Sequence, residues 1–324
     1  MGKLEYFRNL GAFRLTSLTN QFIMKNNRRK FVQMAGTLTA GSLLLPSFGC
    51  NSDKTKGATS PTPTVKTPEE FKLDKFGIQL YSLKEDFAKD PRGVLAKVSE
   101  FGYRQVEGYE IDRGLWWDMA PLEFKEYLVD IDVEMVSSHC DINTDFEKKA
   151  DEAAQVGLEY LICPWVGPQK TKEAWKEVTD KFNKCGAICK KAGIKFGYHN
   201  HAYSFKAFSG MIPHDFIMDN TDPELVDHEM DIYWVVTGGA DPTEYLKKYS
   251  NRFKLCHIKD RMPDTDERMA STNLGTGIID YPSILPVAAA NGMKYYFAEQ
   301  ERYEGTTALE SAKLNANYLR GLRG

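Results

Sequence analysis

The sequence has little excess charge of either sign and lacks several common signatures. Its 324 residues carry 42 lysines and arginines against 45 aspartates and glutamates, a formal net charge of −3. This balance gives no general reason to expect a nucleic-acid partner, because such partners usually require a basic face. No Gly-x-Gly-x-x-Gly fingerprint follows the first predicted strand. Its absence disfavours an open dinucleotide-binding fold.

The six cysteines include no Cys-x-x-Cys pair. Cys185 and Cys189 stand at i, i+4 spacing, which is more typical of one helix face than of a zinc site. Apart from Cys50, the cysteines are odd in number, which argues against a complete disulfide framework. We expect these residues to pack as small apolar side chains.

The first fifty residues contain the parts of an export signal. A basic segment at 27–30 precedes an uncharged run at 31–49, and Cys50 follows. The adjacent arginines resemble a twin-arginine signal, and the setting of Cys50 resembles a bacterial lipobox, with Ser47 where that motif usually has leucine. Polar residues and proline in the run disfavour a transmembrane helix. We expect an exported, periplasmic protein that touches the membrane only through this signal or a lipid on Cys50.

Three regions follow from this interpretation. Residues 1–23 form an extension before the signal, and we expect translation to begin at Met24. Residues 51–70 are rich in Ser, Thr, Pro, Lys and Gly and lack apolar periodicity, which predicts a flexible linker. Residues 71–324 form one predicted catalytic domain.

The predicted domain has the length of a (β/α)₈ TIM barrel, which is typically about 250 residues. Eight β-prone runs are expected at 76–83, 103–109, 133–138, 158–163, 194–198, 225–231, 253–258 and 293–298. Helical patterns separate them at 91–101, 121–130, 146–156, 171–192, 213–218, 242–249 and 281–291, and another closes the chain at 306–319. This alternation predicts a parallel sheet, and eight units favour a closed barrel over an open one.

Acidic, basic and imidazole side chains gather near the C-terminal ends of these runs, where a barrel of this type builds its active site. They are Glu107, His139, His199, His201, Asp231, His257, Lys259 and Glu299. Residues i and i+2 of a strand share a face, so His199 and His201 can both project toward one point. Paired histidines at a strand end are often only polar residues facing water, but four consecutive strands each supply a metal-type ligand. Two carboxylates and two imidazoles suit Mn²⁺, Co²⁺, Fe²⁺ or Zn²⁺ better than Mg²⁺.

Several strings carry a family resemblance. They are GIQLYSL at 77–83, GYHNH at 197–201, Asp231 with the following Ile-Tyr-Trp, HIKD at 257–260, the Gly-Thr-Gly turn at 275–277 and Glu299. Together they resemble the sugar phosphate isomerase/epimerase family with the xylose-isomerase-like TIM barrel, over residues 71–324. The resemblance implies one divalent ion, with Mn²⁺ as the leading candidate. Its implied ligands are His199, Asp231, His257 and Glu299.

One departure from the family bears on the reaction. Many of its sugar epimerases have glutamate at the fifth strand, where this chain offers His199 or His201. The change implies the branch that resembles dehydratases and lyases acting on keto-sugars and inosose-like rings. The ion would acidify a C–H beside the carbonyl, so a base must take that proton and an acid must return one. The candidates are Glu107, His139, His201 and Lys259, each of which could instead only orient substrate or support the structure.

We therefore expect a metal-dependent sugar isomerase or epimerase, or a keto-sugar lyase, acting on a small-molecule sugar. Export argues against a phosphorylated substrate, because sugar phosphates are kept in the cytoplasm. One alternative is a surface carbohydrate-binding lipoprotein that has lost catalysis. Another is an endonuclease-like phosphodiesterase, which the charge balance disfavours. Four tryptophans near the strand ends, Trp116, Trp117, Trp165 and Trp234, could stack on sugar faces or simply pack in the core.

Overall fold

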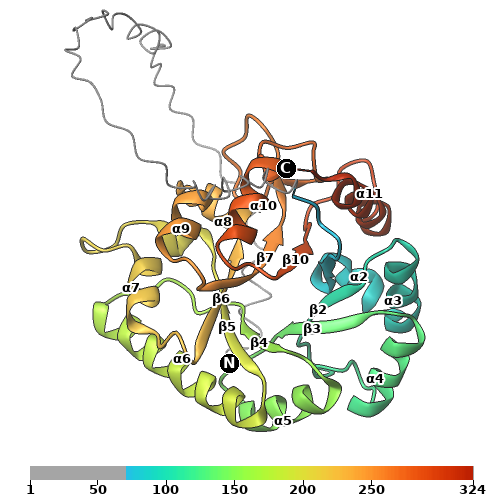
Figure 1. Ribbon diagram of the computed structural model, residues 1–324, viewed down its shortest axis with the longest axis horizontal. Helices are drawn as coiled ribbons and strands as arrows, with labels where there is room; N and C mark the ends of the chain where they lie inside the picture. Colours follow the sequence, from blue (N-terminus) through green and yellow to red (C-terminus); the bar gives the residue numbers. More distant parts are fainter. Residues whose placement is uncertain (1–70, 324) are drawn as a thin grey trace, which may run out of the picture. The chain divides into compact units, whose positions relative to one another are not determined.

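The structure is a computed structural model that describes residues 71–323. The predicted extension, export signal, Cys50 and linker all belong to residues 1–70, which lie outside the described residues. Eight parallel strands form a closed barrel in the order β1-β10-β7-β6-β5-β4-β3-β2. Helices surround this barrel (Figure 1). The predicted TIM barrel is confirmed.

The strands of the barrel are short and alternate with the helices. They are β1 (Gly77–Gln79), β2 (Gln105–Tyr109), β3 (Glu134–His139), β4 (Tyr160–Cys163), β5 (Lys195–His199), β6 (Val226–Asp231), β7 (Phe253–Ile258) and β10 (Tyr295–Ala298). The helices are α2 (Lys84–Phe87), α3 (Pro91–Glu100), α4 (Pro121–Asp130), α5 (Phe146–Val156), α6 (Lys172–Ala192), α7 (Pro213–Asn220), α8 (Ile232–Thr237), α9 (Pro242–Lys248), α10 (Tyr281–Ala290) and α11 (Ala308–Gly321).

The helix ends follow from local sequence signals. Thr171 accepts a hydrogen bond from the backbone of Ala174 at the start of α6, and Gly193 ends that helix with a φ of +84°. At the start of α11, Thr307 and Glu310 form a reciprocal capping box. Such caps satisfy backbone N–H groups that a helix terminus leaves free. They explain why these helices begin within two residues of the predicted positions.

An apolar layer fills the barrel beneath the polar strand ends. Its buried side chains are Val136, Tyr160, Ile162, Leu255 and Phe297. Leu255 and Phe297 stand two residues before His257 and Glu299, so each pair points to the same side of its strand. The barrel interior is therefore apolar in this layer and ionisable in the layer above it.

Two segments differ from the sequence-based expectation. The first strand was expected to continue to Leu83, but β1 ends at Gln79 and a 3₁₀ helix, η1 (Leu80–Leu83), follows. The Gln79 side chain accepts a hydrogen bond from the Tyr81 N–H at 3.0 Å, and this contact turns the chain. No helix was expected between the strand that ends at Asp231 and the helix at 242–249, but residues 232–237 form α8, whose first turn Asp231 caps.

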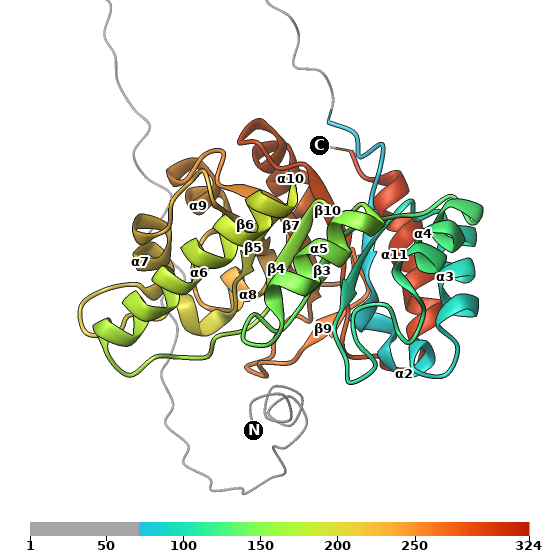
Figure 2. The same ribbon diagram turned by 90° about the horizontal axis from the view of Figure 1, so that it is seen from below.

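The segments that follow the strand ends gather at one end of the barrel. Figure 2 shows α2, α8 and the short strand β9 (Ser271–Thr272) at this end. β9 pairs with β8 (Asp260–Arg261) in a separate antiparallel ribbon. The five cysteines from Cys140 onward are buried and unpaired, as expected. Within residues 71–323, no helix has the length and apolar character needed to cross a membrane.

Candidate metal centre and active site

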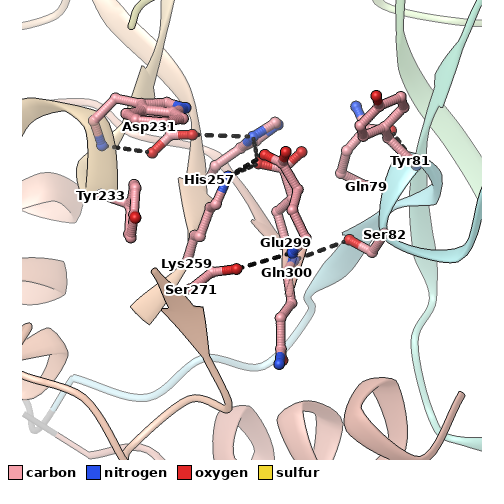
Figure 3. A network of polar contacts seen from close by, with 12 residues as sticks. Gln79, Tyr81, Ser82, Asp231, Tyr233, His257, Lys259, Ser271, Glu299 and Gln300 are labelled. Atoms are coloured by element: carbon pink, nitrogen blue, oxygen red, sulfur yellow. Dashed lines mark hydrogen bonds and ion pairs between the residues drawn. The ribbon is translucent and has the colours of Figure 1, made fainter. Parts of the chain in front are cut away.

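The predicted strand-end residues meet at this end of the barrel. In the sheet register, His199 of β5 lies opposite Glu229 of β6, and Asp231 of β6 lies opposite His257 of β7. β10 lies beside β7, and Glu299 directly follows its last residue. Figure 3 shows the side chains of Asp231, His257 and Glu299 converging from these strands.

Local contacts fix the orientation of Asp231. Its Oδ1 accepts a hydrogen bond from the Trp234 N–H at 3.0 Å at the start of α8. Its backbone N–H and C=O both bond to the side-chain amide of Asn200, at 3.2 and 3.1 Å. The asparagine of the GYHNH string therefore ties the ends of β5 and β6 together. The second carboxylate oxygen, Oδ2, is buried and has no hydrogen-bond partner.

Three side chains form a compact group of metal-ligand type. The ligand atoms of Asp231, His257 and Glu299 all lie within 4.8 Å of one another. His257 Nδ1 is 3.1 Å from Glu299 Oε2 and 3.8 Å from Asp231 Oδ2. His199 Nε2 approaches the same Asp231 oxygen at 3.7 Å. These separations fit donors that share one ion, which stand about 3–4 Å apart for bonds of roughly 2.0–2.2 Å.

The chemistry of the group fits a divalent ion. A buried carboxylate oxygen without a partner is costly unless something binds it. Burial raises the pKa of Asp231 to about 7, with a further contribution from Glu299 and an opposing one from Lys259. A cation would satisfy the free Oδ2. Two imidazoles and two carboxylates form a mixed donor set that suits Mn²⁺, Fe²⁺, Co²⁺ or Zn²⁺.

A second ionisable group overlaps with the first at His257 and includes a residue that the sequence analysis missed. Oε2 of Glu229 is 2.8 Å from His139 Nε2 and 2.9 Å from His199 Nδ1. The ligand atoms of His139, His199, Glu229 and His257 also lie within 4.8 Å of one another. Glu229 stands two residues before Asp231 on β6. This i, i+2 spacing was the available signal, because it places both carboxylates on one face of the strand.

Glu107 already uses both of its carboxylate oxygens. Its Oε1 accepts hydrogen bonds from Gln79 Nε2 at 2.7 Å and from His257 Nε2 at 2.6 Å. Its Oε2 accepts one from Ser137 Oγ at 2.6 Å, and His139 Nε2 lies 3.1 Å from Oε1. This arrangement favours a role in holding His257 over the proton-transfer role predicted from the sequence.

The buried carboxylates and imidazoles change one another's pKa values. Burial acts to raise the pKa of Glu107, but His139 and His257 outweigh it and hold that pKa well below its usual range. Burial acts to lower the pKa of His139, but Glu107 and Glu229 raise it to about 9. Burial and the charge of Glu107 raise the pKa of Glu229 to about 7. At neutral pH, Glu107 and His139 therefore form an oppositely charged pair.

Lys259 is buried beside the candidate ligands. Its Nζ lies 3.3 Å from Glu299 Oε2 and also bonds Glu301, which the sequence analysis did not select. Tyr281 fixes the Lys259 backbone, because its hydroxyl donates to the Lys259 C=O at 2.7 Å and accepts from the Lys259 N–H at 2.8 Å. Burial acts to lower the pKa of Lys259, but Glu299, Glu301 and Asp231 raise it well above its usual value. The group is an ammonium ion at neutral pH.

His201 occupies a different environment from His199. It follows β5 and precedes the 3₁₀ helix η2 (Ala202–Phe205), and its ring centroid is 4.6 Å from that of Trp165 and 5.4 Å from that of Trp234. Its Nδ1 is buried and has no hydrogen-bond partner. Burial, assisted by the positive charge of Lys259, holds the pKa of His201 well below its usual range. The imidazole is neutral at neutral pH.

The four tryptophans divide into two pairs. Trp117 packs against Phe87 at 4.5 Å between ring centroids, and Trp116 donates a hydrogen bond to Glu152 at 2.9 Å. Both are buried in the helix layer. Trp165 and Trp234 flank His201. Only this second pair stands beside the candidate site.

All eight predicted site residues belong to one network, but at different depths. His139, His201 and Glu299 keep 8%, 7% and 6% of their surface exposed, whereas Glu107 and His257 are fully enclosed. The exposed fraction marks the three side chains that face the barrel mouth. Side chains that touch a substrate are therefore expected among these three. Lys259 is fully buried but lies directly beside one of them, with its Nζ 3.3 Å from Glu299 Oε2.

The family model described as xylose isomerase-like TIM barrel matches residues 95–322. The chain belongs to this family. The predicted family is thereby confirmed.

Individual relatives give a finer picture. An inosose dehydratase from Geobacillus kaustophilus is 34% identical over 187 residues, which are 56% of this chain and 57% of that protein. The chain spans about half the length of the curated relatives that it matches. A crystal structure of a sugar phosphate isomerase/epimerase from Parabacteroides distasonis has 30% identity and a TM-score of 0.66, covering 76% of this chain and 93% of that one. A 3-keto-D-glucoside 4-epimerase from E. coli, at 16% identity and a TM-score of 0.60 over 76% of this chain and 99% of that one, shares the fold.

Proposed function

We propose that this chain is a metal-dependent enzyme that removes a proton next to the carbonyl of a non-phosphorylated keto-sugar or keto-glycoside. The outcome is isomerisation or epimerisation, or elimination of a leaving group as in a lyase or dehydratase. The observation that carries the proposal is the convergence of Asp231, His257 and Glu299, with one buried carboxylate oxygen left unpaired. A folded chain rarely buries such groups without a ligand.

The relatives support this class of reaction. Inosose dehydratases are among the similar proteins, and a 3-keto-D-glucoside 4-epimerase shares the fold. Elimination of water beside a keto group and epimerisation next to it can begin with the same proton removal. One site that holds a carbonyl near a base can therefore serve either outcome, and the second proton transfer decides between them.

The ion is proposed to be held by His199, Asp231, His257 and Glu299, with Mn²⁺ preferred and Co²⁺, Fe²⁺ or Zn²⁺ as alternatives. When bound, it would act as a Lewis acid that polarises substrate oxygens. The two imidazoles each keep one nitrogen on a buried carboxylate, His257 on Glu107 and His199 on Glu229. Carboxylate partners of this kind orient metal-binding histidines and raise their basicity.

Proton transfer is assigned to side chains beside this group. His201 is a neutral imidazole with a free Nδ1, and it is proposed to accept the proton from the substrate carbon. Lys259 is an ammonium ion and is proposed to donate to the oxygen on which negative charge develops. His139, with a pKa of about 9, is protonated at neutral pH and is proposed to return a proton or protonate a leaving hydroxyl.

The substrate class and the location are proposed together. Residues 1–50 carry the proposed extension and export signal, Cys50 is a proposed lipidation site, and residues 51–70 are a proposed tether for the catalytic domain. A periplasmic enzyme meets free or glycosidic sugars instead of sugar phosphates. This reasoning supports a neutral keto-sugar as the substrate.

Isotope exchange tests the proposal. A keto-sugar or keto-glycoside deuterated at the carbon next to the carbonyl should lose its label to water or show a primary isotope effect, and chelation should stop the reaction. Retention of deuterium during turnover, together with efficient conversion of a sugar phosphate, would contradict the reaction and the substrate class. Stoichiometric metal without turnover of any keto-sugar would favour a carbohydrate-binding protein that has lost catalysis.

A further inference from the structure

The fully buried carboxylate of Glu229 lies between three imidazoles. Its Oε2 is 2.8 Å from His139 Nε2, 2.9 Å from His199 Nδ1 and 3.5 Å from His257 Nε2. Its Oε1 has no hydrogen-bond partner. A buried charge is retained at a cost, so a role for this residue is expected.

The contact with His199 decides which ring nitrogen is available to an ion. In its ionised form Glu229 only accepts hydrogen bonds, so His199 Nδ1 then carries the proton of the bond to Glu229 Oε2. The other nitrogen, Nε2, then presents its lone pair toward Asp231 Oδ2, which is 3.7 Å away. Among residues 71–323, no comparable carboxylate contact sets the tautomer of His201, whose Nδ1 has no hydrogen-bond partner there.

We propose that Glu229 is a positioning residue that makes His199, and not His201, the ligand from β5. The inference rests on the proposed metal site and deepens it. Glu229 holds the His199 ring in the Nδ1–H tautomer and directs Nε2 at the ion, while the same oxygen accepts a hydrogen bond from His139. The sheet register supports this role, because His199 and Glu229 are direct neighbours across β5 and β6.

A second ion held by the group around Glu229 is the competing explanation. His139, His199, Glu229 and His257 are close enough to suggest one. However, Glu229 Oε2 lies only 2.8 and 2.9 Å from the two imidazole nitrogens, which are hydrogen-bond lengths. Donors that share one ion stand farther apart, at about 3–4 Å. Glu107 also bonds His257 at 2.6 Å, so that nitrogen is already occupied.

Metal affinity tests the role of Glu229 without any assay of turnover. Purified wild type and Glu229→Gln are titrated with Co²⁺ against a chromogenic chelator, and the absorption spectrum of bound Co²⁺ is recorded. Loss of an orienting partner typically weakens metal binding by about 10- to 100-fold, which is the loss expected here. The Co²⁺ bands should also shift, because His199 is no longer fixed. Asp227→Asn is the matched control, since it removes the same charge two residues earlier on β6 and should leave affinity and spectrum unchanged.

A double-substitution cycle separates positioning from a general loss of stability. In a His199→Ala background, Glu229→Gln should add little to the loss of Co²⁺ affinity, because the ring through which Glu229 acts is gone. If Glu229→Gln lowered the Co²⁺ affinity by the same factor in wild type and in His199→Ala, the inference would be overturned. Two Co²⁺ ions per wild-type chain, a measurement that needs no variant, would also overturn it.

Failure of this inference is distinguishable from failure of the proposed function. If Asp231→Ala binds Co²⁺ as tightly as wild type, the metal site itself is wrong. If Asp231→Ala loses the ion while Glu229→Gln matches wild type in affinity and spectrum, the site stands and Glu229 has no positioning role.

Discussion

His257 Nε2 lies 2.6 Å from Glu107 Oε1, and both side chains are fully buried. The contact leaves Nδ1 as the nitrogen that faces Asp231 and Glu299. Glu107 is itself fixed by Gln79 and Ser137. The orientation of one candidate ligand is therefore set from β1, β2 and β3, on the far side of the barrel from most of the other ligands.

Replacing this partner should weaken the site without unfolding the barrel. Glu107→Gln keeps the volume of the side chain but removes the negative charge opposite His257. We expect metal affinity to fall by about 10- to 100-fold, as for other partners of metal-bound histidines. Equilibrium dialysis followed by elemental analysis measures this. Glu134→Gln on neighbouring β3, an exposed residue paired with Lys75, is the control and should bind metal like wild type.

Lys259→Met should abolish most activity while the ion remains bound. The substitution removes the ammonium group that is proposed to stabilise charge on the substrate oxygen, and losses of roughly 100- to 10,000-fold in kcat are typical for such groups. Lys254→Met, on the same strand and half-buried, is the matched control. Near-normal kcat in Lys259→Met would remove this residue from the proposed proton-transfer groups.

Several positions of the candidate site could be predicted from the sequence because they stand at the C-terminal ends of segments with a clear β pattern. β7 and the inward residue His257 coincide with prediction, as do Asp231 and Glu299. Glu229 was missed because it lies inside β6, two residues before Asp231, whereas the candidate residues were taken from the strand ends alone. Its inward direction depends on the closed barrel, in which Glu229 and Asp231 share the inner face.

Other differences have local causes. The run after Asp231 is rich in aromatic and β-branched residues, which favour strands, yet the Asp231 carboxylate caps α8 and thereby starts a helix. His199 and His201 were expected to project toward one point, and their ring centroids lie 4.9 Å apart. β5 ends at His199, and of these two histidines it is His199 that contacts the carboxylates of β6, while Asn200 bonds the Asp231 backbone. Side-chain contacts of this kind cannot be read from periodicity.

The turn at 275–277 gives a stability prediction. Asp260 of the HIKD string accepts hydrogen bonds from the N–H groups of Gly275 and Gly277 at 3.0 and 2.9 Å. A Cβ on Gly277 would stand 2.1 Å from Asp260 Oδ1 and 2.4 Å from the Arg261 C=O. Gly277→Ala should therefore lower the free energy of unfolding by about 1–3 kcal/mol, as for other overpacked sites.

Chemical denaturation measures this change. Gly321→Ala, at the end of α11, is the control, because a Cβ there meets nothing within 4 Å. It should change stability by no more than about 0.5 kcal/mol. Equal stability of Gly277→Ala and wild type would show that the turn does not need this close approach.

A buried histidine outside the site gives a prediction on pH. His214 stacks on Phe205, with ring centroids 4.6 Å apart, and neither ring nitrogen has a hydrogen-bond partner. Burial lowers the pKa of His214 to about 3, with Lys248 and Arg252 assisting and Asp215 opposing. In the unfolded chain the pKa of His214 is near 6.5, so the unfolded state binds a proton at this ring more readily than the folded state does. The contribution of the neutral His214 ring to stability is therefore complete above pH ~6.5 and is lost as the pH falls toward ~3.

His214→Phe removes this titration. Relative to its effect at pH 8, the substitution should stabilise the protein at pH 5 by about 1–2 kcal/mol. Urea denaturation of both proteins at the two pH values measures the difference. The same stability difference at pH 5 and pH 8 would show that His214 does not titrate in this way.

The metal content of purified wild type and Asp231→Ala, after incubation with excess Mn²⁺ and removal of free ion, tests the proposed metal centre most directly. We expect one tightly bound ion per wild-type chain and none in Asp231→Ala, because the substitution removes the buried Oδ2 that lies between His199 and His257. Circular dichroism should show the same barrel in both proteins. A full equivalent of metal in folded Asp231→Ala would contradict the proposed metal centre.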